Sequence, residues 1–146
     1  MNKNVLFSFC LLLFSFADWH YSLEVAKQIA KKEHKYILLN FSGSDWCGPC
    51  VRMRKELFDS KVFKEMASSY LVLVNADFPR KKKNQPTSEQ KKINEALAEK
   101  YNGQGIFPYT LLLDSNGEII KTWNGFPEET PYSFTMEISN SIQHTQ

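Results

Sequence analysis

The chain has 146 residues, 42% of them hydrophobic and 14% aromatic, so its length predicts one domain and its composition can supply a proper core. The formal net charge is +2 with 23% charged residues, which gives no reason to expect a nucleic-acid partner.

Residues 1–17 have the pattern of a cleaved export signal. Lys3 is the only charge before Asp18, residues 5–16 are apolar, and Ser15 and Ala17 place small side chains at positions −3 and −1. The apolar stretch is shorter than the roughly 20 residues that a membrane-spanning helix needs. We therefore expect residues 1–17 to be removed and residues 18–146 to form the exported domain.

Two other interpretations of this segment stay open. The apolar run could be a buried N-terminal strand or helix, or Cys10 could carry a lipid, although Phe9 is bulky for the residue before a lipidated cysteine. If the signal is cleaved, Cys10 leaves with it and only Cys47 and Cys50 remain. The loop between these two is too short for a stabilising staple, so a structural role explains the pair poorly.

The first half of the domain predicts two helices around a buried strand. Trp19, Leu23, Ala26 and Ala30 recur at helical spacing, which predicts an amphipathic helix over residues 18–32. The continuous apolar run at residues 36–41 is typical of a central strand covered on both faces. After a loop at residues 42–45, a helix should begin near Cys47 and run through Leu57, and a further helical stretch should follow, capped by Asp59 or Ser60.

The second half predicts a strand, a helix, a hairpin and a last helix. A second buried strand covers residues 70–76, and Thr87 with Gln90 forms a capping box for a helix that ends at Asn102-Gly103. Asn116-Gly117 separates apolar runs at residues 109–114 and 118–123 and indicates a hairpin. The last helix should start near Thr130-Pro131 and bury Phe134, Ile138 and Ile142. This order predicts an α/β domain, a mixed sheet with helices on both faces.

A basic run, residues 80–83, lies in the loop after the second strand. Runs of this kind are usually solvated. The alternative is a docking patch for an acidic partner or an anionic surface.

The pentapeptide Trp46-Cys47-Gly48-Pro49-Cys50 follows a predicted strand and opens a predicted helix. Two thiols at this spacing can close a disulfide or open to a dithiol, and can so exchange two electrons with another disulfide. The helix N-terminus would stabilise the thiolate of Cys47, which is the nucleophilic form. Pro49 fits the first helical turn, where amide partners are absent anyway.

With these motifs in place, the chain resembles the thioredoxin family over most of residues 18–146. The pentapeptide matches the active-site motif of the family. Phe107-Pro108-Tyr109, which leads into the hairpin, resembles its cis-proline segment, and Gly125 resembles a glycine that follows the hairpin. The resemblance implies a thioredoxin-like fold.

The resemblance also implies roles for these residues. Cys47, the more exposed thiol, would attack the substrate disulfide, and Cys50 would resolve the mixed disulfide. Pro108, in cis, would lie against the pair, and with Phe107 and Tyr109 would bind an extended substrate segment. Trp46 would cover the pair, unless it serves ordinary packing.

Three departures from the family pattern bear on function. The buried aspartate and the lysine that accompanies it in thioredoxins correspond here to Asn40 and Leu73, and an asparagine cannot act as a base. The loop before the motif is one residue longer, and Asp45 in it is either a replacement acid or an exposed loop carboxylate. The stretch at residues 77–89 is longer than the equivalent segment of thioredoxin, and in this it resembles exported thioredoxin-like proteins linked to disulfide isomerisation.

The sequence therefore predicts an exported thiol–disulfide oxidoreductase, a reductase or isomerase, acting without a cofactor in the periplasm or another extracytoplasmic space. Its expected partners are disulfide-containing secreted proteins and a membrane-bound or other thiol-redox recycling partner, with no nucleic acid and no stable membrane insertion.

Two alternatives come from other functional classes. A binding or chaperone module would use the apolar surface around Trp46, Phe107 and Tyr109. A zinc module would use Cys47 and Cys50 as two of four ligands, but the three histidines lack ligand spacing, so no metal site is expected.

Overall fold

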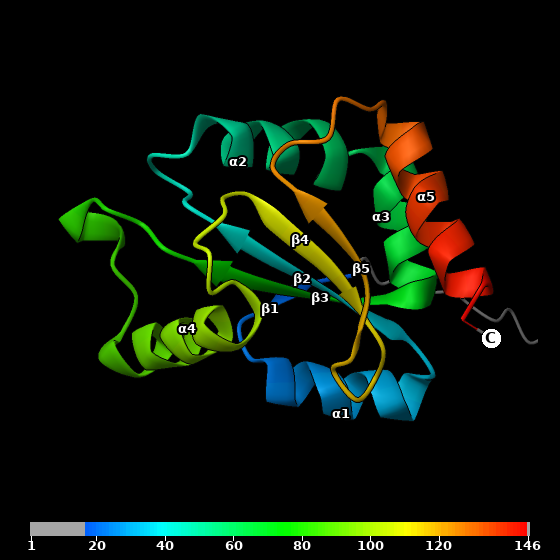
Figure 1. Cartoon of the computed structure of the whole chain (residues 1–146), viewed down its shortest axis with the longest axis horizontal. Helices are drawn as coiled ribbons and strands as arrows, with labels where there is room; N and C mark the ends of the chain where they lie inside the picture. Colours follow the sequence, from blue (N-terminus) through cyan, green and yellow to red (C-terminus); the bar gives the residue numbers. More distant parts are fainter. Residues whose placement is uncertain (1–16, 146) are drawn as a thin grey trace, which may run out of the picture.

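The computed structural model of the chain describes residues 17–145 and contains a five-stranded sheet in the order β1-β3-β2-β4-β5 (Figure 1). The strands are β1 (Trp19–His20), β2 (Tyr36–Ser42), β3 (Leu71–Asp77), β4 (Tyr109–Leu113) and β5 (Ile119–Asn124). β1, β3 and β2 are parallel, and β4 and β5 join them as an antiparallel hairpin. The predicted mixed sheet is confirmed.

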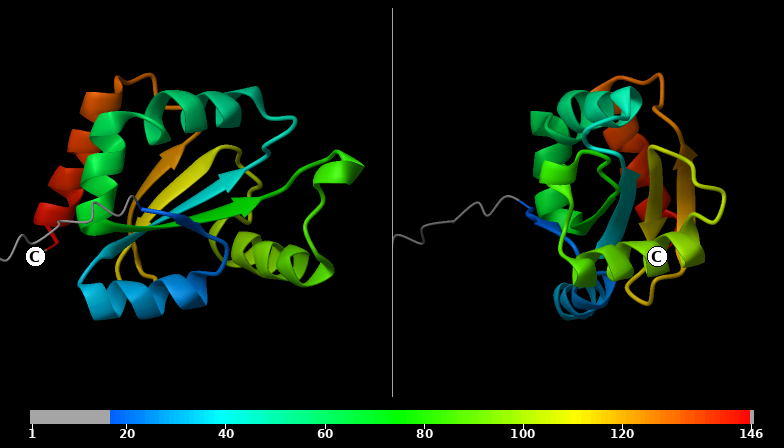
Figure 2. Two further views of the ribbon diagram at one scale, coloured as in Figure 1. Left: turned by 180° about the vertical axis from the view of Figure 1, so that it is seen from behind. Right: turned by 90° about the vertical axis from the view of Figure 1, so that its left-hand side faces the viewer.

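Helices cover both faces of the sheet, as predicted (Figures 1 and 2). One face carries α1 (Leu23–Glu33) and α4 (Ser88–Tyr101), and the other carries α2 (Gly48–Arg52), α3 (Lys61–Tyr70) and α5 (Pro131–Gln143). A π-helical segment, η1 (Met53–Phe58), continues α2, and a short 3-10 turn, η2 (Lys82–Asn84), lies in the loop after β3.

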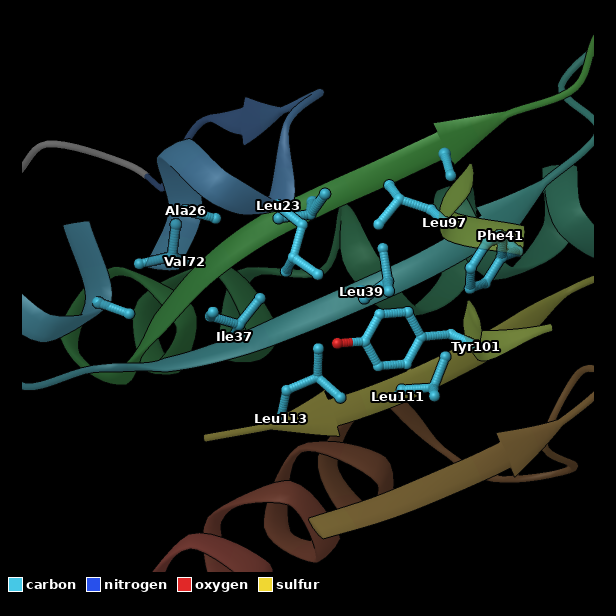
Figure 3. Close-up of a cluster of buried hydrophobic side chains, with 13 residues drawn as sticks. Leu23, Ala26, Ile37, Leu39, Phe41, Val72, Leu97, Tyr101, Leu111 and Leu113 are labelled. Carbon is cyan, nitrogen blue, oxygen red and sulfur yellow. The ribbon is translucent and has the colours of Figure 1, made fainter. Parts of the chain in front are cut away.

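The central strand β2 separates two cores because successive side chains of a strand point to opposite faces. Ile37, Leu39 and Phe41 pack against α1 and α4, in the cluster of Figure 3. Leu38 points the other way and packs with η1, α3 and α5. A strand buried on both faces explains the continuous apolar run in this part of the sequence.

The N-terminal helix is shorter than predicted. Residues 18–32 do not form one helix, because Trp19 and His20 form the edge strand β1 opposite Leu73 and Val74. The Trp19 ring packs 5.2 Å from that of Phe58, so a contact distant in sequence overrides the local helical spacing. The helix begins only after Ser22, whose hydroxyl caps it.

Residues 1–16, which hold Cys10 and nearly all of the predicted export signal, lie outside the described residues. Within the part of the chain that is described, no helix has both the length and the apolar character that a membrane crossing requires.

Candidate active site

The cysteine pair lies just beyond the carboxyl end of β2, at the start of α2. Gly43 O accepts the N–H groups of Trp46 (3.2 Å) and Cys47 (2.9 Å), so the turn closes immediately before the pair. Cys47 is the N-cap of α2, and its Sγ accepts the N–H of Cys50 at 3.3 Å. Cys47 and Cys50 form a disulfide with their Cα atoms 5.2 Å apart.

Exposure does not separate the two cysteines in this oxidised state. Cys47 is 5% exposed and Cys50 is 4% exposed. The expected excess exposure of Cys47 is therefore not present at the residue level. Gly48 and Pro49, between them, are exposed and form the outer surface of the active-site loop.

The Phe107–Pro108 peptide bond is cis, as the resemblance implies. β2 and β4 are antiparallel, so the start of β4 reaches the same end of the sheet as the cysteine pair. Pro108 is buried, and its carbonyl accepts the N–H of Gly125 at 2.9 Å.

The two aromatic neighbours of Pro108 have different surroundings. The Phe107 ring meets the Trp46 ring edge-on, with centroids 5.5 Å apart, so these two residues do come together. The Tyr109 ring instead stacks on Phe41, at 6.3 Å, and packs against the core beneath α1 and α4.

Trp46 is held from three further sides. Its indole Nε1 donates to the Phe78 carbonyl at 2.7 Å, and the guanidinium of Arg80 lies 3.9 Å from its ring centre. Its indole also covers Gly43 so closely that a Cβ added there would lie 2.3 Å from Trp46 Cε2. Trp46 therefore has one defined orientation beside the cysteine pair, and Gly43 is a requirement for it.

A Gly43→Ala substitution should displace Trp46. The indole would lose its contacts with Phe78 and Arg80, and overpacking of this kind typically costs about 1–3 kcal/mol of unfolding free energy. Urea denaturation monitored by circular dichroism measures the loss. Gly48→Ala is the matched control, because nothing lies within 4 Å of a Cβ at Gly48. Equal stability of the two variants would contradict this packing.

Behind the pair lies a cluster of neutral polar side chains, in which Asn40 and Thr110 are buried and Asn75 is half-buried. Asn40 Nδ2 donates to Asn75 Oδ1, and Thr110 Oγ1 donates to Asn40 Oδ1, both at 3.0 Å. Asn40 is directly opposite Asn75 in the sheet, whereas Leu73 is opposite Leu38. The partner of Asn40 on β3 is therefore the amide of Asn75, and not Leu73, as the resemblance implied.

Asn40 and Cys50 line a common pocket of about 240 Å³. The remaining lining comes from Trp19, Ser42, Ser44, Val51, Arg54, Lys55, Phe58 and Asn75. None of these described residues carries a carboxylate, and two carry a positive charge. The lining thus gives Cys50 polar surroundings without a carboxylate, and the carboxylate of Asp77 lies behind it, where it accepts from Ser42 Oγ (3.1 Å) and Ser44 N–H (2.9 Å). Asn75 had one signal in the sequence, a polar residue inside an otherwise apolar strand.

Asp45 holds the following loop instead of facing Cys50. Its two carboxylate oxygens accept the backbone N–H groups of Arg80 (2.8 Å) and Lys81 (2.9 Å) and the side-chain amide of Asn84 (2.9 Å). These donors, the Arg80 amide first, lower the pKa of Asp45 below its usual value because they stabilise the charged form. The geometry is that of a loop-fixing carboxylate.

Potential metal ligands are scattered over the described residues. In the range 17–145, no group of three or more His, Cys, Asp or Glu side chains converges on one point.

Comparison with known proteins agrees with this geometry. The sequence matches the family model described as Thioredoxin-like domain over residues 23–136. It is 38% identical over 93 residues to "Disulfide bond reductase DsbH" of Chlamydia pneumoniae, covering 64% of this chain and 54% of that protein. It is 32% identical over 113 residues to "Thioredoxin-related protein DsbJ" of the same organism, covering 77% of this chain and 31% of that protein. The chain thus spans about half the length of the first relative and less of the second.

A solved structure described as "DsbH Oxidoreductase" is similar over nearly the whole chain. It has a TM-score of 0.79 and 28% identity, and the match covers 97% of this chain and 95% of that one. The chain belongs to the family of thioredoxin-like domains.

Proposed function

We propose that the chain is a thiol–disulfide oxidoreductase that reduces or isomerises disulfides of exported proteins through Cys47 and Cys50. The observation that carries the proposal is the Cys47–Cys50 disulfide at the start of α2, at the same sheet end as the cis-Pro108 loop. The name of the relative, a disulfide bond reductase, supports the same chemistry.

The reaction needs only the two thiols of the reduced protein. The Cys47 thiolate attacks one sulfur of a substrate disulfide, forms a mixed disulfide and releases the other substrate sulfur as a thiolate. Cys50, after losing its proton, attacks Cys47 Sγ and releases the second substrate thiol. The substrate gains two electrons and two protons, and the protein ends with the Cys47–Cys50 disulfide. A thiol-redox partner must reduce that disulfide before the next cycle.

The neighbouring residues of the site have supporting roles in this proposal. Gly48 and Pro49 are exposed between the two buried cysteines and offer the surface that a substrate would meet, and Trp46 with Phe107 forms an aromatic wall beside it. Pro108 lacks an N–H and turns the chain, which leaves nearby backbone groups free to pair with an extended substrate. Tyr109 contributes from the core side, because its ring stacks on Phe41 and supports the loop.

The redox potential of the pair separates reduction from isomerisation. Equilibrium of the protein with glutathione mixtures, followed by quantifying the disulfide, measures it. A value near about −270 mV, that of thioredoxin, would favour a reductase, and a value near about −180 mV, that of protein disulfide isomerase, would favour isomerisation or oxidation. A pair that never exchanges with glutathione would contradict the proposed function.

Export with cleavage before Asp18 is part of the proposal. The mature protein should begin at Asp18 and lack Cys10, which intact-mass spectrometry of the protein recovered from the extracytoplasmic fraction will check. A mature form that retains Cys10 would contradict the cleavage site, and a lipid mass on Cys10 would establish the anchor instead.

A further inference from the structure

The loop between β3 and α4 lies at the end of the sheet where α2 begins with the cysteine pair (Figure 1), and it contains four consecutive cationic residues. We call residues 79–85 the basic loop. Its side chains Arg80, Lys81, Lys82 and Lys83 are all exposed. The thiol chemistry requires none of the four side chains, and the packing of the two cores does not involve them, although Arg80 stacks on Trp46.

The backbone of the basic loop is fixed, although its side chains are exposed. Asp45, one residue before Trp46, accepts three hydrogen bonds from the loop at 2.8–2.9 Å. Gln85 Nε2 donates to the Pro79 carbonyl at 2.6 Å and closes the base of the loop. Asp45, immediately before the redox motif, therefore fixes the backbone that carries the four charges, and a loop with an ordered backbone loses less entropy on binding than a flexible one.

The basic loop also contacts the active-site aromatic wall. The Arg80 guanidinium lies 3.9 Å from the centre of the Trp46 ring, and Trp46 lies edge-on to Phe107. Trp46 Nε1 bonds the carbonyl of Phe78, the residue just before the loop. A chain that crosses the cysteine pair along this wall would come within reach of the loop.

The charge on the basic loop is largely uncompensated. Among the ion pairs formed by residues 17–145, none involves Arg80, Lys81, Lys82 or Lys83. Asp45 is the carboxylate bound to the loop, and it accepts from backbone amides and Asn84 rather than from a cationic side chain. Four cations beside one carboxylate attract a negative partner over about 8 Å at physiological salt.

We propose that the basic loop docks an acidic segment of the substrate protein that flanks its disulfide, so the enzyme prefers disulfides with Asp or Glu nearby. This inference rests on the proposed function and adds a substrate class to it. A protein segment fits better than an anionic membrane for two reasons. Residues 79–85 contain no large apolar side chain, so the basic loop itself has nothing to insert into a bilayer. A membrane on this face would also cover the cysteine pair.

Two disulfide-bonded peptide pairs test the proposal. They are identical except that one carries glutamates and the other glutamines beside the disulfide. The reduced protein should reduce the acidic peptide about tenfold faster, as kcat/KM, at low ionic strength, and added salt should narrow the difference. Serine-containing versions of both peptides, titrated into the oxidised protein and followed by NMR, should show the same preference in binding.

Neutralised variants locate the effect. Lys82→Gln/Lys83→Gln should lose most of the preference while the glutamine peptide reacts as in the wild type. Lys31→Gln/Lys32→Gln changes net charge equally at the end of α1, just before β2 begins at the other end of the sheet, and should keep the preference.

Three results would overturn the docking proposal: equal rates for the two peptides in the wild type, an unchanged preference in Lys82→Gln/Lys83→Gln, or binding to anionic vesicles but not to the acidic serine peptide. Failure of the proposed function looks different. Neither disulfide peptide would then be reduced, while the binding comparison would still report on the basic loop.

Discussion

The Cys47→Ser variant is expected to lose insulin-disulfide reduction down to the uncatalysed rate. Cys47 caps α2, and its Sγ accepts the N–H of Cys50, so the helix start is arranged around this sulfur. A serine can keep that hydrogen bond, but it supplies no thiolate at neutral pH. The insulin turbidity assay with dithiothreitol as the reductant measures the loss, and activity close to wild type would refute Cys47 as the attacking thiol.

The Cys50→Ser variant should behave differently, because attack remains and resolution is lost. It should accumulate mixed disulfides with substrate proteins, visible as adducts on non-reducing gels of cell extracts and released by reductant. Cys47→Ser/Cys50→Ser is the matched control and should form no adducts. If Cys50→Ser also forms none, Cys50 is not the resolving thiol.

An Asn40→Asp substitution should speed the resolving step, roughly tenfold or more at neutral pH, by adding a proton acceptor to the pocket that Cys50 lines. Asparagine and aspartate have nearly the same shape, so the pocket should persist. Single-turnover kinetics with a substrate that forms a detectable mixed disulfide, recorded over neutral and alkaline pH, measures the rate.

The same substitution should lower stability in a pH-dependent way. A protonated carboxyl can still donate to Asn75 Oδ1 and accept from Thr110, as Asn40 does. An ionised carboxylate has no proton to donate, so its oxygen would face Asn75 Oδ1 without a hydrogen bond. Burial and this hydrogen bond both favour the neutral form, whereas Arg54 and Lys55, which line the pocket, are exposed and screened by solvent, so the pKa of the introduced carboxyl should rise above the unfolded value of about 4. The variant should match the wild type below that pH and lose stability as the pH rises, by about 3 kcal/mol for a two-unit shift.

Asn94→Asp is the control for this experiment. Asn94 is buried to a similar degree, 4% exposed against 5% for Asn40, but it lies on α4 and bonds the Asp77 carbonyl. It should lose stability with rising pH without a change in the resolving rate. An unchanged rate in a folded Asn40→Asp variant would mean that the resolving step does not use this pocket.

Local signals in the sequence predicted most of the fold. The apolar runs predicted β2 and β3, and Asn116-Gly117 predicted the hairpin. Thr87 caps α4 as expected, and α5 begins at Pro131, where its start was predicted. Each of these signals is contained in a short stretch of sequence and depends on residues that are close to one another along the chain. The contiguous motif from Trp46 to Cys50 made the redox pair recognisable for the same reason.

The missed features depend on partners far apart in sequence. β1 exists because Trp19 pairs opposite Leu73, and no pattern within residues 18–32 carries that information. The sequence around Asp45 does not predict its hydrogen bonds to Arg80 and Asn84, and the sequence around Trp46 does not predict that Arg80 stacks on its ring. Such contacts follow from how the loops meet at one end of the sheet, which the sequence specifies only through the whole fold.

The paired amides of Asn40 and Asn75 also bear on how the central strands find their alignment during folding. β2 and β3 are nearly uniform apolar runs, and such strands could slide past one another with little change in contact. A slip of β3 by one residue would place Asn75 on the opposite face of the sheet from Asn40, and a slip by two would keep both amides on one face but move them apart. Either misalignment leaves the amides without their partners. Each unsatisfied buried group would cost about 1–3 kcal/mol of stability, so the pair favours a single register of β2 and β3.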